Sequence, residues 1–406
     1  MQERSAGLVD DALTSHQRRQ NLVAVIAAMA VAALIYGLSL PLLSLVMNER
    51  GVERTIIGLS TAVQSVGMVM IAPFLPAYMR RSGPAALMLC AILVTLVAFL
   101  LLPVFSSLPA WMALRFVIGC AGSVLWICGE AWINQVATDR IRGRVVALYS
   151  MAVAAGFAGG PLLLSLTGSR GATPFLISSA IMLLAALPLL TVMRIAPRLD
   201  GERTSALPRY FLLAPLAMSL FAVFAVVEGI VLTFLPLYGI ELGLTEAQGL
   251  YLITLMGVGG IVGQIPIGWL ADHVDRMFLA AACILFSGVA GLLMPAVLAI
   301  PSWNWVFMLL FGAALSGIYT VAMVIIGDRF RGADLAAASA LYGIMWGAGS
   351  VLGPPIGGVA MDLFPPHGVP LSIAALLAAF LPFAVISCLR RHRSVAGSAS
   401  RSGAPL

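Results

Sequence analysis

Three ionisable residues stand inside long apolar stretches of the sequence: Arg115, Glu130 and Glu228. A charged side chain costs roughly 3 kcal/mol at the centre of a membrane, so such residues face a cavity or a partner and are functional candidates. Glu130 is our candidate for proton coupling, because an apolar environment disfavours the charged carboxylate. A fixed hydrogen bond in helix packing, for example to Asn134 one turn further on, is the alternative.

The elements that position these residues are predicted to be membrane spans. The chain is 61% apolar and 10% charged, with a mean hydropathy of +1.03, a composition that requires lipid as the solvent. The five cysteines fall in or at the end of apolar stretches, so we expect neither a disulfide framework nor a metal site. Charges and turn residues divide the sequence into an all-α protein of twelve transmembrane helices, near residues 21–47, 56–79, 84–105, 109–137, 145–169, 172–193, 210–239, 247–271, 277–299, 303–327, 335–362 and 370–389.

The arginines predict the orientation of these spans. All 23 basic residues are Arg, which we interpret as base composition and not as a nucleic-acid-binding device. If both termini are cytoplasmic, the inner segments hold 19 arginines and the outer loops hold three: Arg50, Arg54 and Arg170. Because short cytoplasmic loops are enriched in Arg, we predict a multi-pass protein of the bacterial inner membrane with both termini in the cytoplasm.

An internal repeat predicts two related halves. The loop Asp139-Arg140-Ile141-Arg142-Gly143 recurs 189 residues later as Asp328-Arg329-Phe330-Arg331-Gly332. Gly160-Pro161 likewise recurs as Gly353-Pro354, 193 residues later. Ordered matches of this kind indicate a duplication, here of a six-helix unit. We therefore predict two pseudo-symmetric six-helix bundles at 21–193 and 210–390, a cytoplasmic linker at 194–209, and cytoplasmic tails at 1–20 and 391–406.

Three strings near the ends or middles of spans form recognisable motifs. Span eight and its loop contain Gly268, Asp272 and Arg276; span eleven contains a GxxxGPxxGG string that includes Gly353 and Pro354. Span four opens with Arg115-Phe116-Val117-Ile118-Gly119. Small residues at this spacing also let two helices pack closely, so helix packing is the alternative to a role in antiport for the glycine-proline string. Asp272 could equally do no more than end a helix in water.

Taken together, these strings resemble the major facilitator superfamily over residues 21–390. Gly129-Glu130-Ala131-Trp132-Ile133-Asn134 and Gln264-Ile265-Pro266-Ile267-Gly268-Trp269 are similar to its YcaD-like branch. The resemblance implies a central cavity lined by spans one, four, seven and ten, in which an Arg115–Glu228 contact would hold the outer side closed. Because Arg80 stands where the first half would carry the counterpart of Asp272, we expect gate charges centred on Asp272 and Arg276.

The repeat places Tyr319 opposite Glu130, since each lies nine residues before its Asp-Arg-x-Arg-Gly loop. An aromatic side chain facing a carboxylate suits a solute with an apolar or cationic part. Other aromatic and amide side chains are candidates for the same pathway, although each could instead serve packing, interfacial anchoring or a hydrogen bond between helices: Tyr36, Gln64, Trp126, Trp132, Gln264, Tyr342 and Trp346.

These observations predict a secondary active transporter that moves a small organic solute by alternating access. We expect proton coupling and favour export by antiport over uptake; proton-symport or facilitative uptake is the alternative. The sequence contains no P-loop, and no histidine falls within a span, so we expect neither ATP hydrolysis nor an enzyme's catalytic constellation. The expected partners are the solute, the proton and the lipid bilayer, for a monomer without cofactor, metal or nucleic acid.

Overall fold

A computed structural model describes residues 14–138, 141–196, 207–298, 300 and 303–402, and these residues form helices and turns without any strand. Twelve helical segments are long and apolar enough to cross a membrane, which confirms the predicted architecture. The helices are α2 (Ser15–Glu49), α3 (Arg54–Ile71), α4 (Leu75–Ser82), α5 (Pro84–Leu101), α6 (Leu108–Val136), α7 (Arg142–Thr167), α8 (Thr173–Val192), α9 (Leu207–Leu213), α10 (Pro215–Glu241), α11 (Glu246–His273), α12 (Arg276–Leu298), α13 (Asn304–Arg329), α14 (Gly332–Leu363) and α15 (Gly368–Ser402).

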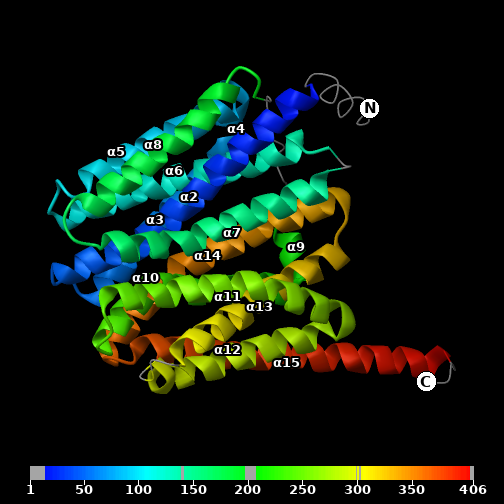
Figure 1. The fold of residues 1–406 in the computed structure, drawn as a ribbon. Helices are drawn as coiled ribbons and strands as arrows, with labels where there is room; N and C mark the ends of the chain where they lie inside the picture. Colours follow the sequence, from blue (N-terminus) through cyan, green and yellow to red (C-terminus); the bar gives the residue numbers. More distant parts are fainter. Residues whose placement is uncertain (1–13, 139–140, 197–206, 299, 301–302, 403–406) are drawn as a thin grey trace.

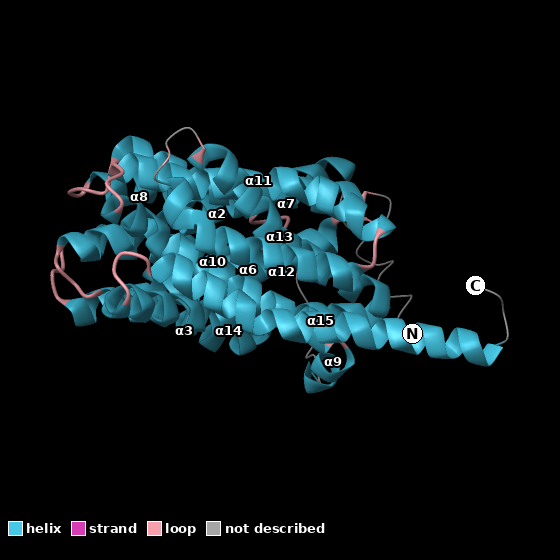
Figure 2. Ribbon diagram, turned by 90° about the horizontal axis from the view of Figure 1, so that it is seen from below, coloured by secondary structure: helices cyan, strands magenta, loops and turns pink. Residues whose placement is uncertain are grey.

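The spanning helices pack as two bundles, α2–α8 and α10–α15 (Figure 1). The halves meet where α3 packs on α14, α7 packs on α11 and α2 packs on α10. The long helices run side by side in the two perpendicular views (Figures 1 and 2), as helices that cross one bilayer must. The two six-helix bundles expected from the repeat are therefore present.

Prolines explain where the helices depart from the predicted spans. The second span is interrupted by a 3-10 turn at Ala72–Phe74 and continues as α4, because Pro73 and Pro76 cannot donate a backbone hydrogen bond. The start predicted for span seven is a separate short helix, α9, since Pro215 begins α10 and forces the preceding residue out of the helical conformation. Most of the predicted linker and the first 13 residues lie outside the described residues.

The last helix is longer than predicted. Helix α15 continues to Ser402, past the predicted end of span twelve, and projects beyond the other helices (Figure 2). The sequence after that end contains arginines, which favour helix, and has no Pro before the helix ends. Part of the predicted tail 391–406 is accordingly helical.

Glycines set the closest contacts within each half. A Cβ on Gly156 of α7 would overlap the backbone of Ala30 in α2, and a Cβ on Gly349 of α14 would overlap the backbone of Ala222 in α10. The two contacts are equivalent in the repeat, with offsets of 193 and 192 residues. The glycine-proline string of α14 thus packs one helix tightly on its neighbour, the packing role that small residues have in membranes.

Candidate functional site

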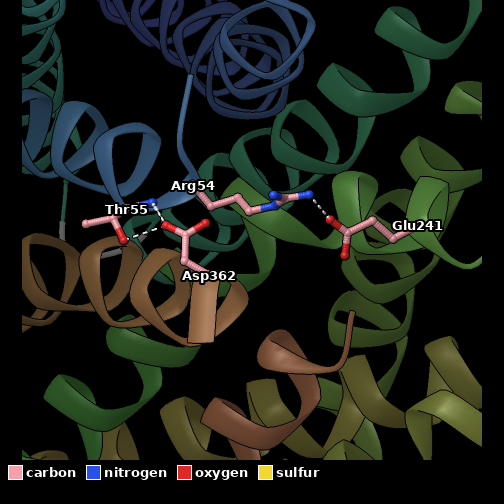
Figure 3. A network of polar contacts seen from close by, with 4 residues as sticks. All are labelled: Arg54, Thr55, Glu241 and Asp362. Carbon is pink, nitrogen blue, oxygen red and sulfur yellow. Dashed lines mark hydrogen bonds and ion pairs between the residues drawn. The ribbon is translucent and has the colours of Figure 1, made fainter. Parts of the chain in front are cut away.

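One end of the molecule, which we call the arginine-poor end, carries Arg50, Arg54 and Arg170; the opposite end, where most arginines lie, is the arginine-rich end. At the arginine-poor end the two halves are joined by polar contacts (Figure 3). Asp362 of α14 accepts hydrogen bonds from the backbone N–H and the hydroxyl of Thr55 in α3, at 2.8 and 2.7 Å. Arg54 also forms an ion pair with Glu241 of α10.

Close backbone packing accompanies these polar contacts. A Cβ on Gly58 of α3 would overlap the carbonyl of Pro354 in α14, and a Cβ on Gly358 would overlap the carbonyl of Arg54. The backbone N–H of Ser169, before α8, donates to Glu246 of α11 at 2.8 Å. Backbone contacts and hydrogen bonds together close the arginine-poor end.

Toward the arginine-rich end, several predicted pathway residues are exposed. Glu130 and Asn134 lie exposed in the last turns of α6, and Gln264 is exposed in α11. The expected Glu130–Asn134 hydrogen bond does not form; the Glu130 carboxylate instead accepts a hydrogen bond from the hydroxyl of Tyr149 in α7, at 3.2 Å. Glu130 is therefore bonded to the neighbouring helix α7 and not within α6.

Tyrosines from both halves surround Glu130. Its carboxylate acts electrostatically on Tyr319 of α13 and Tyr342 of α14 as well as on Tyr149. Tyr319 and Tyr342 both pack on Phe221 of α10, with ring centroids 5.4 and 4.7 Å away. The repeat relates Glu130 to Tyr319 and Tyr149 to Tyr342, so the duplication itself brings this group together.

A second carboxylate, Glu228 of α10, lies deeper between the halves and is partly buried. Its Oε2 accepts a hydrogen bond from the indole Nε1 of Trp346 in α14, at 3.0 Å. Glu228 also acts electrostatically on Tyr36 of α2, which belongs to the first half. Tyr36 and Glu228 are also repeat equivalents, 192 residues apart, on the two helices that Gly156 and Gly349 align.

The two carboxylates are thus arranged crosswise. Near the arginine-rich end, Glu130 of the first half lies within electrostatic range of Tyr319 of the second. Deeper in, Glu228 of the second half lies within electrostatic range of Tyr36 of the first half and of Tyr319 of its own half. Glu130 lies 22 residues from the arginine-poor end of α6 and Glu228 lies 13 residues from that end of α10, a separation in depth of about 13 Å. We call these four residues the crossed pairs.

Arg115 does not pair with Glu228, so the predicted ion pair is wrong for this conformation. The Arg115 guanidinium is fully buried, and its NH1 donates to the hydroxyl of Thr61 in α3 at 2.6 Å. Its Nε and NH2 form no hydrogen bond with any residue that the structure describes. Arg115 and Thr61 each lie seven residues inside the arginine-poor end, whereas Glu228 lies thirteen. This difference places Glu228 about 9 Å deeper than Arg115.

A small cavity of about 40 Å³ adjoins the deeper crossed pair. Tyr36, Gln64 and Trp346 line it together, and Gln64 is 1% exposed with its Oε1 unpartnered. Trp126 also lines the cavity, whereas Trp132 lies fully buried elsewhere and donates to the Asn21 side chain at 3.0 Å, a packing role. The remaining walls are largely apolar and include Ala32, Ile35, Met68, Ile118, Leu125, Phe157 and Met182.

A family model described as "Major Facilitator Superfamily" matches residues 25–318 and 251–405, which is most of the chain. The chain belongs to the major facilitator superfamily. The MFS-type transporter YfkF of Bacillus subtilis (strain 168) is 24% identical over 349 residues, covering 84% of this chain and 88% of YfkF. The MFS-type transporter YcaD of Escherichia fergusonii is 26% identical over 289 residues, covering 70% and 74%. These relatives confirm the predicted similarity of this chain to the YcaD-like branch of the superfamily.

Solved structures of the superfamily share this fold. A bacterial homologue of the human lysosomal transporter Spinster, in an inward-facing and unoccupied conformation, gives a TM-score of 0.76 at 14% identity over 92% of this chain and 96% of that one. A mutant of the nucleoside transporter NupG gives 0.72 at 12% identity, over 90% and 97%. The protein is therefore a major facilitator superfamily transporter spanning the membrane many times, and not an enzyme.

The superfamily motif at the end of α11 forms a different charge contact from the one predicted. Arg276 pairs with Asp328 at the end of α13 and donates to the Ala271 carbonyl at 3.3 Å. Asp272 is exposed and has no ion pair with any residue that the structure describes. Gly268 is open, since a Cβ built there would meet no atom within 4 Å. Arg276 thus pairs with Asp328 and not with Asp272 in this conformation.

Several site residues escaped the sequence reasoning. Asp328 belongs to the repeated Asp-Arg-x-Arg-Gly loop, and Tyr149 lies 193 residues before Tyr342, the same offset as the Gly-Pro repeat. The repeat was therefore the available signal for both residues. Thr61, the partner of Arg115, lies in none of the repeated strings, so the repeat could not have indicated it. Likewise, nothing in the sequence pairs Arg54 with Glu241, because that contact depends on which ends of α3 and α10 the fold brings together.

Proposed function

We propose that this transporter exports a small amphipathic organic solute from the bacterial cytoplasm in exchange for protons, as a monomer working by alternating access. The excess of arginines supports placing the arginine-rich end, and both termini, in the cytoplasm. In that orientation the closed arginine-poor end faces outward, and the structure corresponds to an inward-facing conformation.

The observation that carries the proposal is the arrangement of the crossed pairs. An ionised carboxylate is unfavourable within a membrane protein unless it is hydrated, paired or hydrogen-bonded, so Glu130 and Glu228 can each gain and lose a proton as their surroundings change. Glu130 is exposed toward the arginine-rich end and bonded to Tyr149, a setting that suits proton release to the cytoplasm. Each carboxylate is hydrogen-bonded within its own half and lies near tyrosines of the opposite half, so rocking of the halves would change the environment of both.

The cavity lining supports an amphipathic solute. Tyr36, Trp126, Phe157 and Trp346 offer aromatic faces, which bind apolar groups and cations, and Glu228 adds negative charge beside them. Small-molecule sites combine such apolar walls with a few polar groups that orient the ligand. A solute with an apolar body and a cationic group fits this chemistry.

The experiment compares wild-type protein with Glu130→Gln in proteoliposomes under an imposed pH gradient, with tetraphenylphosphonium as the first solute and a panel of amphipathic cations after it. We expect gradient-driven flux in the wild type and its loss in the variant, because glutamine cannot carry a proton. Downhill flux without a gradient should persist in both and serves as the folding control. Undiminished gradient-driven flux in Glu130→Gln would remove this residue from coupling.

A further inference from the structure

A groove opens between the arginine-rich ends of α2 and α7, separate from the cavity already described. Its volume is about 870 Å³, and none of its lining residues lines the cavity beside Tyr36 and Trp346. The groove forms because α2 and α7 touch at the Gly156–Ala30 contact and diverge beyond it toward their first residues, as Figure 1 shows.

The walls of the groove are apolar along its length. Val23 is 61% exposed and Leu148 is 57% exposed, although both are large aliphatic side chains. From Arg19 to Ala30 the groove follows α2 for eleven residues, or about 16 Å, which is close to the length of a lipid acyl chain. The other apolar lining residues are Leu22, Ile26, Ala27, Ile141, Val145 and Ala152.

The mouth of the groove is basic. Arg18 and Arg19 line it together with Ser15. Arg144 adds another exposed arginine in the first turn of α7. Clusters of arginine at the end of a spanning helix attract anionic lipid headgroups.

We infer that this groove binds one anionic phospholipid of the leaflet at the arginine-rich end. The phosphate lies at Arg18 and Arg19, and one acyl chain lies along the apolar walls between α2 and α7. A water-soluble phosphate would use the arginines but leave the walls exposed, and an uncharged lipid would use the walls but not the arginines. Only an anionic amphiphile matches the whole groove.

The test is a native mass spectrometry titration of the purified full chain with dioleoylphosphatidylglycerol and dioleoylphosphatidylcholine. We expect one phosphatidylglycerol to bind about 30-fold more tightly than phosphatidylcholine, roughly fivefold for each of two arginines. Arg18→Gln/Arg19→Gln should abolish this preference. The control variant Arg80→Gln/Arg81→Gln should keep the preference. It removes two adjacent exposed arginines from the last turn of α4, which also lies at the arginine-rich end of the molecule.

A second pair of variants tests the apolar walls. Ala27→Trp fills the groove and should weaken phosphatidylglycerol binding while leaving the arginines in place, whereas Leu183→Trp on the exposed face of α8 should not. Equal binding of the two lipids, or an equal loss in the Arg80/Arg81 control, would overturn the inference. Competition by glycerol 3-phosphate as strong as that by the intact lipid would also overturn it, because it would show a phosphate site that needs no chain.

Discussion

Removing the Asp362 carboxylate should weaken the contact that closes the arginine-poor end. Asp362 accepts two hydrogen bonds from Thr55 across the two halves, at 2.8 and 2.7 Å, in an exposed setting. Because water competes at an exposed site, we take the lower part of the usual range, about 0.7 kcal/mol for each bond. The sum, about 1.4 kcal/mol, corresponds to a tenfold change in the ratio of closed to open molecules.

The assay for this prediction measures access to the interior from the arginine-poor side. Gln64 is 1% exposed and lines the cavity, whose walls belong to the first half except for Trp346 of the second, so a cysteine in its place is protected while that end is closed. In a chain whose five native cysteines are replaced by alanine, we expect Asp362→Ala to speed labelling of Gln64→Cys by a membrane-impermeant thiol reagent about tenfold.

The control for this prediction is a contact of the same kind that does not join the halves. Glu49 pairs with Arg170 at the same end, at 3.0 Å, but both residues belong to the first half. Glu49→Ala should therefore leave the labelling rate unchanged. An unchanged rate in Asp362→Ala, or an equal increase in Glu49→Ala, would refute our reasoning that Thr55 and Asp362 hold this end closed.

Three further predictions concern side chains elsewhere in the fold. Tyr149→Phe should reduce gradient-driven flux about fivefold, because it removes one hydrogen bond of roughly 1 kcal/mol to the coupling carboxylate; unchanged flux in proteoliposomes would contradict this. Gly349→Leu should destabilise the protein by more than about 3 kcal/mol in detergent unfolding, because its side chain would overlap α10, whereas Gly268→Ala should change stability by less than about 1 kcal/mol. Arg276→Gln and Asp328→Asn should each cost about 0.5 kcal/mol, since the pair is partly exposed, and a double-mutant cycle giving no coupling would dismiss the contact.

The sequence predicted the fold because the membrane imposes a simple rule on it. Each span must be a long apolar helix, and the repeat then gives the two bundles and their equivalent positions. The same repeat relates Tyr319 to Glu130 as equivalent positions of the two halves, and their role in one pathway stays a prediction. Periodicity and duplication therefore carry the architecture and part of the site.

Contacts between side chains of different helices were less predictable. To predict whether Arg115 and Glu228 pair, the depth of each residue in the membrane must be known to within one helical turn. Hydropathy does not locate the ends of spans that finely. Arg276 had two acidic candidates nearby, and only the packing of α11, α12 and α13 selects Asp328 over Asp272. The outcome of such choices depends on helix rotation and tilt, which packing sets.

The most direct test of proton-coupled export is to record solute and proton movement in the same proteoliposomes. With a pH-sensitive dye inside and no imposed gradient, an inward gradient of a transported amphipathic cation should drive protons out, so that the lumen becomes alkaline. Glu130→Gln should abolish this pH change while still letting the cation move downhill. Acidification of the lumen, or cation flux in the wild type with no pH change, would contradict the account.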